Sequence, residues 1–156
     1  MKITAQDEYG LRLLLQIARA NQNEGLSISQ LSELEGLSPS YVGKLTRQLR
    51  LAGFIESTRG QKGGYVLSRP ADQILVKDVL RTLGGPLFDE SFCNSHSGGF
   101  RFCTNSVDCS LRSLWTMIQQ AVDHVLADLT LQDLIQPKRT LEPLFESLSQ
   151  KGNSSD

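Results

Sequence analysis

The chain has 156 residues, and its 16 Lys and Arg against 17 Asp and Glu leave a formal net charge of −1. An apolar share of 39% with a charged share of 21% is ordinary for a globular protein and excludes disordered, collagen-like and disulfide-packed chains. No apolar run approaches the ~20 residues of a membrane span, and residues 1–8 lack the apolar core of a signal peptide. These features predict a cytoplasmic protein with no membrane segment.

The charge is distributed unevenly along the chain. Residues 38–69 hold six basic side chains against one acidic side chain, whereas the segments on either side are both net acidic. A short basic segment in an otherwise acidic protein is typical of nucleic-acid binding, with an ordinary solvated face as the alternative.

Two helices are expected before residue 37. Thr4 is a candidate cap for the first, which ends before the break at residues 21–25. Ser27 opens the second, Gln30 completes a capping box, and Gly36 ends the helix. The expected apolar stripes are Tyr9, Leu11, Leu14, Leu15 and Ala18 in the first helix, and Ile28, Leu31 and Leu34 in the second.

A third helix is expected from Ser38, where a hydroxyl cap is followed by proline, to about Ala52. Its buried stripe would be Val42, Leu45, Leu49 and Ala52. With the preceding helix it predicts a helix–turn–helix, whose second helix enters the major groove of DNA; a plain helical hairpin is the alternative. The candidate DNA contacts on its start and outer face are Ser38, Ser40, Tyr41, Lys44, Arg47 and Gln48.

A β-hairpin is expected next. Residues 54–58 alternate as a strand, with Phe54 and Ile55 on opposite sides, and residues 65–67 form the return strand. The turn over residues 59–64 has two cations and three glycines, which makes a basic and sterically bare wing. Arg59, Gly60 and Lys62 are its candidate DNA contacts, with Arg59 placed to enter a narrow minor groove.

The second half of the chain reads as a helix over residues 72–83, a long loop over residues 86–107, and a further helix from Val107. Apolar residues repeat at helical spacing from Leu111 to Leu129, which predicts a dimerisation helix; packing on its own wing domain is the alternative. The fold class is therefore mainly α with a small β-wing. The expected organisation is a winged helix–turn–helix domain (1–70), a linking helix with a cysteine-bearing loop (71–106), a dimerisation helix with a capping segment (107–135) and a partly flexible tail (136–156).

Three cysteines, Cys93, Cys103 and Cys109, surround this loop and the start of the helix that follows it. Thiolates are ligands of zinc and of iron–sulfur clusters, so the group is a candidate metal site. The spacing matches no common zinc-finger pattern, and three free thiols remain the alternative.

Taken together, residues 1 to about 135 resemble the bacterial iron–sulfur transcription regulators typified by IscR, NsrR and RirA. The resemblance covers both halves of the chain. It rests on residues 11–12 (Leu-Arg), 36–41 (Gly-Leu-Ser-Pro-Ser-Tyr), 49–55 (Leu-Arg-Leu-Ala-Gly-Phe-Ile), 59–65 (Arg-Gly-Gln-Lys-Gly-Gly-Tyr) with Leu67, 78–80 (Asp-Val-Leu), the three cysteines, and 111–115 (Leu-Arg-Ser-Leu-Trp).

The resemblance implies a homodimer on a palindromic DNA operator, with a 2Fe–2S or 4Fe–4S cluster held by the three cysteines between the wing domain of one subunit and the long helix of the other. Arg112 stands where IscR-like members have a histidine ligand, and a guanidinium has no lone pair to offer. NsrR-like members use an acidic residue near the N-terminus of the partner subunit, and the matching position here is Glu8, with Asp7 beside it. His96 in the loop is the other candidate for the fourth ligand.

The functional expectation is a transcriptional regulator, in the first place a repressor, whose DNA affinity follows iron, redox or nitric oxide status through the cluster. A winged-helix regulator that uses its cysteines as a thiol redox switch or a zinc site is the alternative. An enzyme is not expected, because the sequence has no Ser–His–Asp set, no recognisable pair of catalytic carboxylates and no nucleotide-binding loop.

Overall fold

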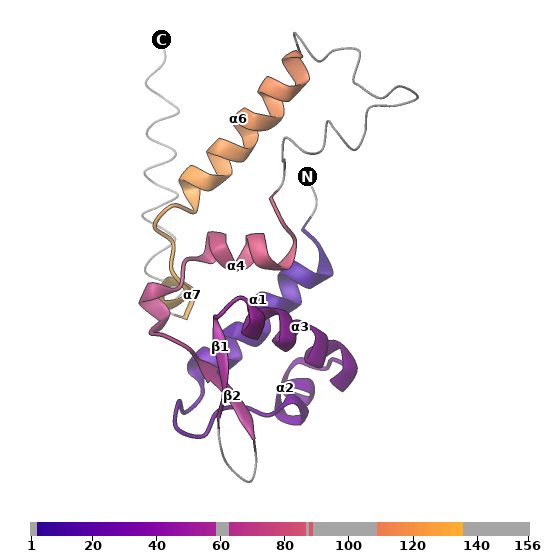
Figure 1. Ribbon diagram of the computed structural model, residues 1–156, viewed down its shortest axis with the longest axis vertical. Coiled ribbons are helices and arrows are strands. Elements are labelled where there is room, and N and C mark those ends of the chain that lie inside the picture. Colours follow the sequence, from indigo (N-terminus) through magenta and orange to yellow (C-terminus); the bar gives the residue numbers. More distant parts are fainter. Residues whose placement is uncertain (1–2, 59–62, 87, 89–108, 136–156) are drawn as a thin grey trace.

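The computed structural model describes residues 3–58, 63–86, 88 and 109–135. It has a body of short helices with a two-stranded sheet, and one long helix that projects from the body (Figure 1). The sheet and the projecting helix lie at opposite ends of the body (Figure 1). The expected fold class, mainly α with a small β-wing, is confirmed.

Local capping signals start and end the first three helices: α1 (Ala5–Arg19), α2 (Ile28–Glu35) and α3 (Pro39–Leu51). Each N-cap hydroxyl, at Thr4, Ser27 and Ser38, accepts a hydrogen bond from a backbone N–H of the first turn, as expected. Gly36 ends α2 with a φ of +65°, a left-handed conformation that glycine adopts without a steric penalty.

The wing consists of β1 (Ile55–Thr58) and β2 (Gly64–Leu67), which pair antiparallel from Ile55 opposite Leu67 to Thr58 opposite Gly64. The Thr58 side chain closes the described end of the hairpin, because its Oγ1 accepts from the Gly64 N–H (3.0 Å) and donates to the Gly64 carbonyl (3.2 Å). The expected alternation fails at the base of the wing: Phe54 and Ile55 are both buried, because Phe54 precedes the strand in the turn that follows α3.

The expected single helix over residues 72–83 is wrong. The segment divides into a 3₁₀ turn, η1 (Ala71–Gln73), and the helix α4 (Val76–Leu83). Between them the extended backbone pairs with a distant part of the chain. The Val76 N–H donates to the Leu129 carbonyl (2.9 Å), and the Leu131 N–H donates to the Ile74 carbonyl (2.8 Å). These bonds satisfy backbone groups that would otherwise have joined a continuous helix.

The long helix is also shorter than expected: α6 spans Ser110–Val125, and a turn leads from it into α7 (Leu131–Ile135). In the stripes expected for the first three helices, two positions are solvent-exposed, namely Leu34 (56% exposed) and Ala52. No helix among the described residues is long and apolar enough to cross a lipid bilayer.

The core lies where α1, α2, α3, α4 and the sheet meet, and α7 completes it. Leu131 of α7 is fully buried in the same cluster as Leu14, Leu45 and Val79. The segment expected to cap the dimerisation helix therefore packs into the core of the winged-helix body.

Replacement of Leu131 by alanine should lower the free energy of unfolding by about 2–5 kcal/mol, because it leaves a cavity in the shared core. The neighbouring Gln132 is exposed, so Gln132→Ala should stay within about 0.5 kcal/mol of the wild type. Urea unfolding followed by circular dichroism measures both. A loss below about 1 kcal/mol for Leu131→Ala would show that α7 does not contribute to this core.

Candidate nucleic-acid interface and cysteine site

Helix α3 has one buried and one exposed face. Val42, Leu45 and Leu49 are fully buried against the core. Ser40, Lys44 and Arg47 are exposed and recur at helical spacing on the opposite side, and Ser38 is exposed at the N-cap. The structure thus brings four of the expected contact residues onto one exposed polar and cationic surface, which we call the α3 face.

Gln48 lies at the edge of this surface and is only partly exposed. Its Oε1 atom is buried and has no hydrogen-bond partner among the described atoms. A buried acceptor without a partner is unfavourable.

Tyr41 is half-buried, and its ring packs edge-on against that of Tyr9 in α1, with centroids 6.1 Å apart. The Arg12 guanidinium lies 5.5 Å from the centroid of the Tyr9 ring. Tyr41 therefore takes part in packing between α1 and the start of α3, a role that its position on the amphipathic pattern did not reveal.

A buried carboxylate connects α1 to α2. The Glu35 side chain is only 4% exposed; it accepts from Arg12 Nε (2.6 Å) and from Gln16 Nε2 (2.7 Å). A buried carboxylate is costly unless it is paired in this way. The pair was not anticipated, since 23 residues separate Arg12 from Glu35 and neither stands in a recognisable motif.

The base of the wing is joined to the turn between α1 and α2. Leu26 and Tyr65 exchange two backbone hydrogen bonds, and the Gln22 side chain accepts from the Leu67 N–H (3.0 Å). The expected contacts at the wing tip, Arg59, Gly60 and Lys62, lie outside the described residues. Arg69, one of the six cations of the basic segment, instead folds back: its Nη1 donates to the Gly53 carbonyl (2.9 Å), and its guanidinium lies over the Phe54 ring.

Of the three cysteines, only Cys109 lies within the described residues; Cys93 and Cys103, like His96, lie outside them. Cys109 is the N-cap of α6, and its thiol is free and half-buried. Its Sγ accepts from the Arg112 N–H (3.4 Å). The Cys109 sulfur atom therefore lies at the N-terminus of α6, within reach of a backbone donor.

The two acidic candidates for the fourth ligand have different surroundings. Asp7 belongs to the capping box of α1, where its Oδ2 accepts from the N–H (2.9 Å) and the hydroxyl (2.6 Å) of Thr4. Glu8 is exposed and lines a mainly apolar groove of about 330 Å³ between α1, α4 and α6, to which Leu11, Leu80 and Val122 contribute.

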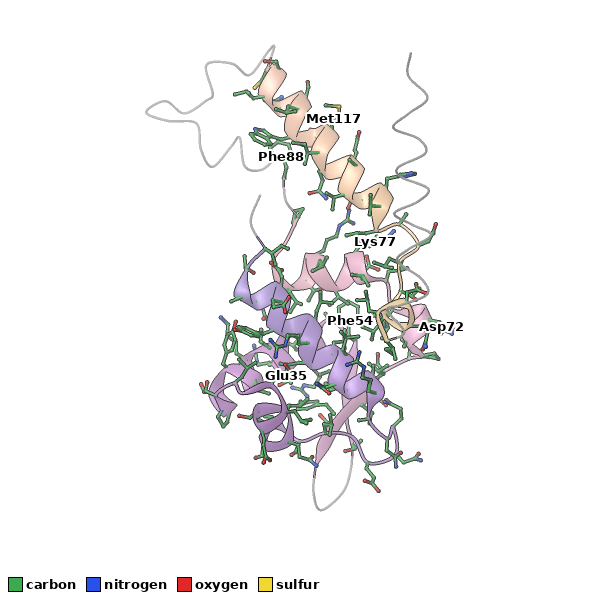
Figure 2. All side chains as sticks on the ribbon, turned by 180° about the vertical axis from the view of Figure 1, so that it is seen from behind. Glu35, Phe54, Asp72, Lys77, Phe88 and Met117 are labelled. Atoms are coloured by element: carbon green, nitrogen blue, oxygen red, sulfur yellow. The ribbon has the colours of Figure 1, made fainter. Side chains whose placement is uncertain are left out.

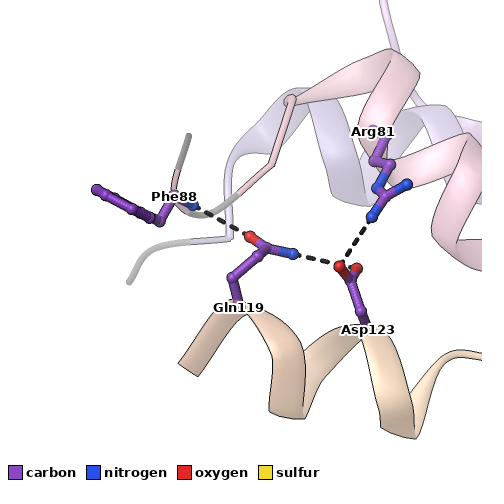
Figure 3. A network of polar contacts seen from close by, with 4 residues as sticks. All are labelled: Arg81, Phe88, Gln119 and Asp123. Atoms are coloured by element: carbon purple, nitrogen blue, oxygen red, sulfur yellow. Dashed lines mark hydrogen bonds and ion pairs between the residues drawn. The ribbon is translucent and has the colours of Figure 1, made fainter. Parts of the chain in front are cut away.

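Polar contacts hold the C-terminal half of α6 to α4 beside this groove (Figure 3). Arg81 of α4 pairs with Asp123 of α6 (Nη2–Oδ2, 2.8 Å), and Gln119 Nε2 donates to the other oxygen of Asp123 (3.1 Å). The side-chain Oε1 of Gln119 in turn accepts a hydrogen bond from the Phe88 N–H (3.1 Å). The chain leading into the cysteine segment is therefore hydrogen-bonded to α6, and α6 is ion-paired with α4.

The N-terminal half of α6 projects into solvent, and no residue of the helix is buried. Figure 2 shows Met117 on this projecting helix, away from the body that holds Phe54 and Glu35. Large apolar side chains are exposed along it: Leu111 (60%), Leu114 (40%), Trp115 (45%), Met117 (61%) and Val125 (40%). Leu111, Leu114, Trp115 and Val125 recur at helical spacing on one side of α6. An exposed apolar face of this kind is typical of a surface that another protein covers.

The chain matches a family model described as Rrf2, iron-dependent transcriptional regulator, over residues 3–137. It is similar to the HTH-type transcriptional regulator CymR of Bacillus subtilis (strain 168), with 32% identity over 86% of this chain and 89% of CymR.

Solved structures of the same kind of protein are also similar. The structure of CymR, described as the global cysteine regulator of B. subtilis, has a TM-score of 0.68 and 31% identity over 88% of this chain and 98% of that one. The structure of T. potens IscR has a TM-score of 0.67 and 29% identity over 88% of each chain.

The contacts of Tyr41 predict that its ring contributes to stability, while its hydroxyl contributes little to stability or to DNA affinity. Tyr41→Phe keeps the edge-on packing on Tyr9 and should change both stability and DNA affinity by less than twofold in the respective equilibrium constants. Tyr41→Ala should lower the unfolding free energy by about 2 kcal/mol, because the ring packing is lost. Urea unfolding and DNA titration by fluorescence anisotropy measure the two effects. A Tyr41→Phe protein that is stable but binds DNA tenfold more weakly would instead make the hydroxyl a DNA contact.

Proposed function

This chain belongs to the Rrf2 family of iron-dependent transcriptional regulators, and from that premise we propose that it binds a palindromic operator as a homodimer under the control of an iron–sulfur cluster. Its relatives are transcriptional regulators, so the expectation that it is not an enzyme is confirmed. The observation that carries the proposed DNA contact is the exposed α3 face, which the Tyr9–Tyr41 contact joins to α1.

On this proposal α3 lies in the major groove. Lys44 and Arg47 neutralise phosphates or reach guanine, while Ser38 and Ser40 bond phosphates near the N-terminus of the helix. Gln48, which lies partly exposed at the edge of the α3 face, is suited to a base edge because its amide can both donate and accept. Arg59, Gly60 and Lys62 of the wing tip would follow the adjacent minor groove.

The exposed apolar residues of α6 support a homodimer. A twin helix packed on Leu111, Leu114 and Trp115 would bury side chains that are 40–60% exposed in the single chain. A two-fold symmetric dimer presents two α3 faces, which accounts for a palindromic operator. Occupation of that operator would repress transcription wherever it overlaps a promoter.

Cys93, Cys103 and Cys109 are the proposed thiolate ligands of the 2Fe–2S or 4Fe–4S cluster. The described member of the set fits this role, since Cys109 has a free thiol at a helix N-terminus with a backbone donor on its sulfur. When bound, such a cluster supplies an iron centre whose state depends on iron supply, oxidants or nitric oxide. The protein's part is to hold that centre against α6 and against the first helix.

Glu8 is the proposed fourth ligand, in preference to Asp7 and His96. Asp7 would have to give up two hydrogen bonds of the α1 capping box in order to bind iron, whereas Glu8 is exposed and faces the groove beside α6. Carboxylate is a harder donor than thiolate, and a weaker ligand for such a cluster, which suits a site that must respond to a signal.

The position of Glu8 also supplies a route to DNA. It adjoins Tyr9, which packs on Tyr41 of α3, and it lies one helical turn before Arg12, which pairs with Glu35 of α2. A displacement of the first turn of α1 on ligand loss would therefore be passed to both helices of the helix–turn–helix. Such coupling requires two arrangements that differ in DNA affinity.

A thiol redox switch or a zinc site is the second candidate for the cysteines. It is favoured by the similarity to CymR, whose structure is described as that of a global cysteine regulator. Anaerobic purification separates the candidates. Iron, sulfide and sulfur-to-iron charge-transfer absorption support the cluster, while colourless protein with zinc, or with thiols that oxidise reversibly, supports the alternative.

Lys44→Ala should weaken binding to all duplexes alike and reduce the slope of log affinity against log salt by about one unit, because one phosphate contact is lost. Lys77, which lines the α4–α6 groove rather than the α3 face, provides the charge-matched control. Lys77→Ala should leave the slope unchanged. If Lys44→Ala instead alters the preference at a single base position, Lys44 reads a base and not a phosphate.

Glu8→Gln should leave folding and dimerisation intact but accelerate loss of the cluster, because an amide is a poorer ligand than a carboxylate. Cys109→Ala should prevent assembly of the cluster. Asp7→Asn should weaken the α1 capping box by about 1 kcal/mol with little change in the cluster spectrum. The measurements are anaerobic absorption spectra, cluster lifetime and thermal unfolding. A Glu8→Gln protein with wild-type spectrum and lifetime would exclude Glu8 and leave His96 as the next candidate.

A further inference from the structure

Gly43 stands inside α3, four residues after the helix begins and eight before it ends. Glycine at an interior helical position is less stable than alanine, since it loses more backbone freedom on folding. A glycine in the middle of a helix therefore requires a reason, and in folded proteins that reason is usually a close approach by another part of the structure.

The described part of the molecule holds no such close approach at Gly43. A β-carbon built there would meet only Ile28 Cδ1, at 3.8 Å, which is an ordinary van der Waals contact. Gly10 of α1 is different, because its β-carbon would come within 2.5 Å of Leu83 Cδ1. The backbone of Gly43 is also in an ordinary helical conformation, and its φ is not positive.

The surroundings of Gly43 indicate what approaches it from outside. It is partly exposed and borders the α3 face: Ser40 lies one turn before it, Lys44 follows it, and Arg47 lies one turn after it. Every one of these neighbours is an exposed polar or cationic residue. The bare stretch of backbone thus lies among the side chains proposed to bind DNA.

We propose that Gly43 is the point of closest approach between α3 and double-stranded DNA, where the missing side chain lets the helix backbone meet the surface of the duplex. The inference rests on the proposed DNA binding by α3. With a β-carbon at this position the helix would stand further from the groove, and Lys44 and Arg47 on either side would reach their partners less well. Glycine is retained here at the expense of helix stability.

The test uses substitutions whose effects on folding and on binding have opposite signs. Gly43→Ala should raise Tm by about 2–4 °C, through helix propensity, while weakening DNA binding about tenfold, within the range of one lost contact. Gly43→Val should weaken binding further, because its side chain is larger. The probe is a duplex selected from a random pool by the wild-type protein, titrated by fluorescence anisotropy with anaerobically purified full-length chain.

Ser113→Ala is the matched control. Ser113 is exposed on α6, away from α3, and a smaller gain in helix propensity of the same sign should raise Tm there without a change in affinity. It separates the contact at Gly43 from any general effect of a more stable protein.

Three results would overturn the proposal. Wild-type affinity in Gly43→Ala would show that DNA does not approach this position. A lower Tm in Gly43→Ala would show that the fold itself requires the glycine. A wild-type protein that selects and binds no duplex would defeat the proposed function together with this inference, and it is recognised without any Gly43 variant.

Discussion

The burial of one carboxylate organises the DNA-binding body. Glu35 is almost fully removed from solvent, which is unfavourable for a charge unless partners replace the lost water. Arg12 and Gln16 supply them, both from α1, so α1 and α2 hold a single relative position. The same Arg12 lies over the Tyr9 ring, and Tyr9 meets Tyr41 at the start of α3. These side chains connect the exposed face of α3 to α1, and none of them needs to touch DNA itself.

A second constraint joins the two halves of the chain. The backbone of residues 74–76 hydrogen-bonds to residues 129–131, and Leu131 enters the winged-helix core. The two segments that flank α6, one ending at Phe88 and one beginning after Val125, are therefore both tied to elements that pack on the body. Arg81 and Asp123 add an ion pair between α4 and α6. Since both side chains are well exposed, this pair orients the helices and adds little to stability.

The first turn of α1 borders the groove that α1 forms with α4 and α6. The groove beside Glu8 is walled by α4 and α6, and α1 continues from Glu8 into the residues that contact α2 and α3. A regulator requires a rigid connection between the place where a signal acts and the surface that binds DNA, together with an element that can shift. On the proposed function, the short distance along α1 from Glu8 to Tyr9 and Arg12 provides the connection. Helix α6, whose exposed apolar face would contact the partner subunit, would be the element that shifts.

Sequence patterns were sufficient to predict the features that depend on neighbouring residues. The caps at Thr4, Ser27 and Ser38, the end of α2 at Gly36 and the hairpin after α3 are local hydrogen bonds and local dihedral angles, so their signals lie within a few residues. The same local patterns, with the cysteines, sufficed for the resemblance to iron–sulfur regulators. The other features of the structure depend on tertiary contacts. The break between η1 and α4, the inward turn of Arg69, the packing of Tyr41 and the burial of Glu35 each depend on groups brought together from separate segments of the chain. Local sequence patterns do not predict such contacts. Their free energy comes from pairing and desolvation between elements, and not from the helix or strand propensity of either element.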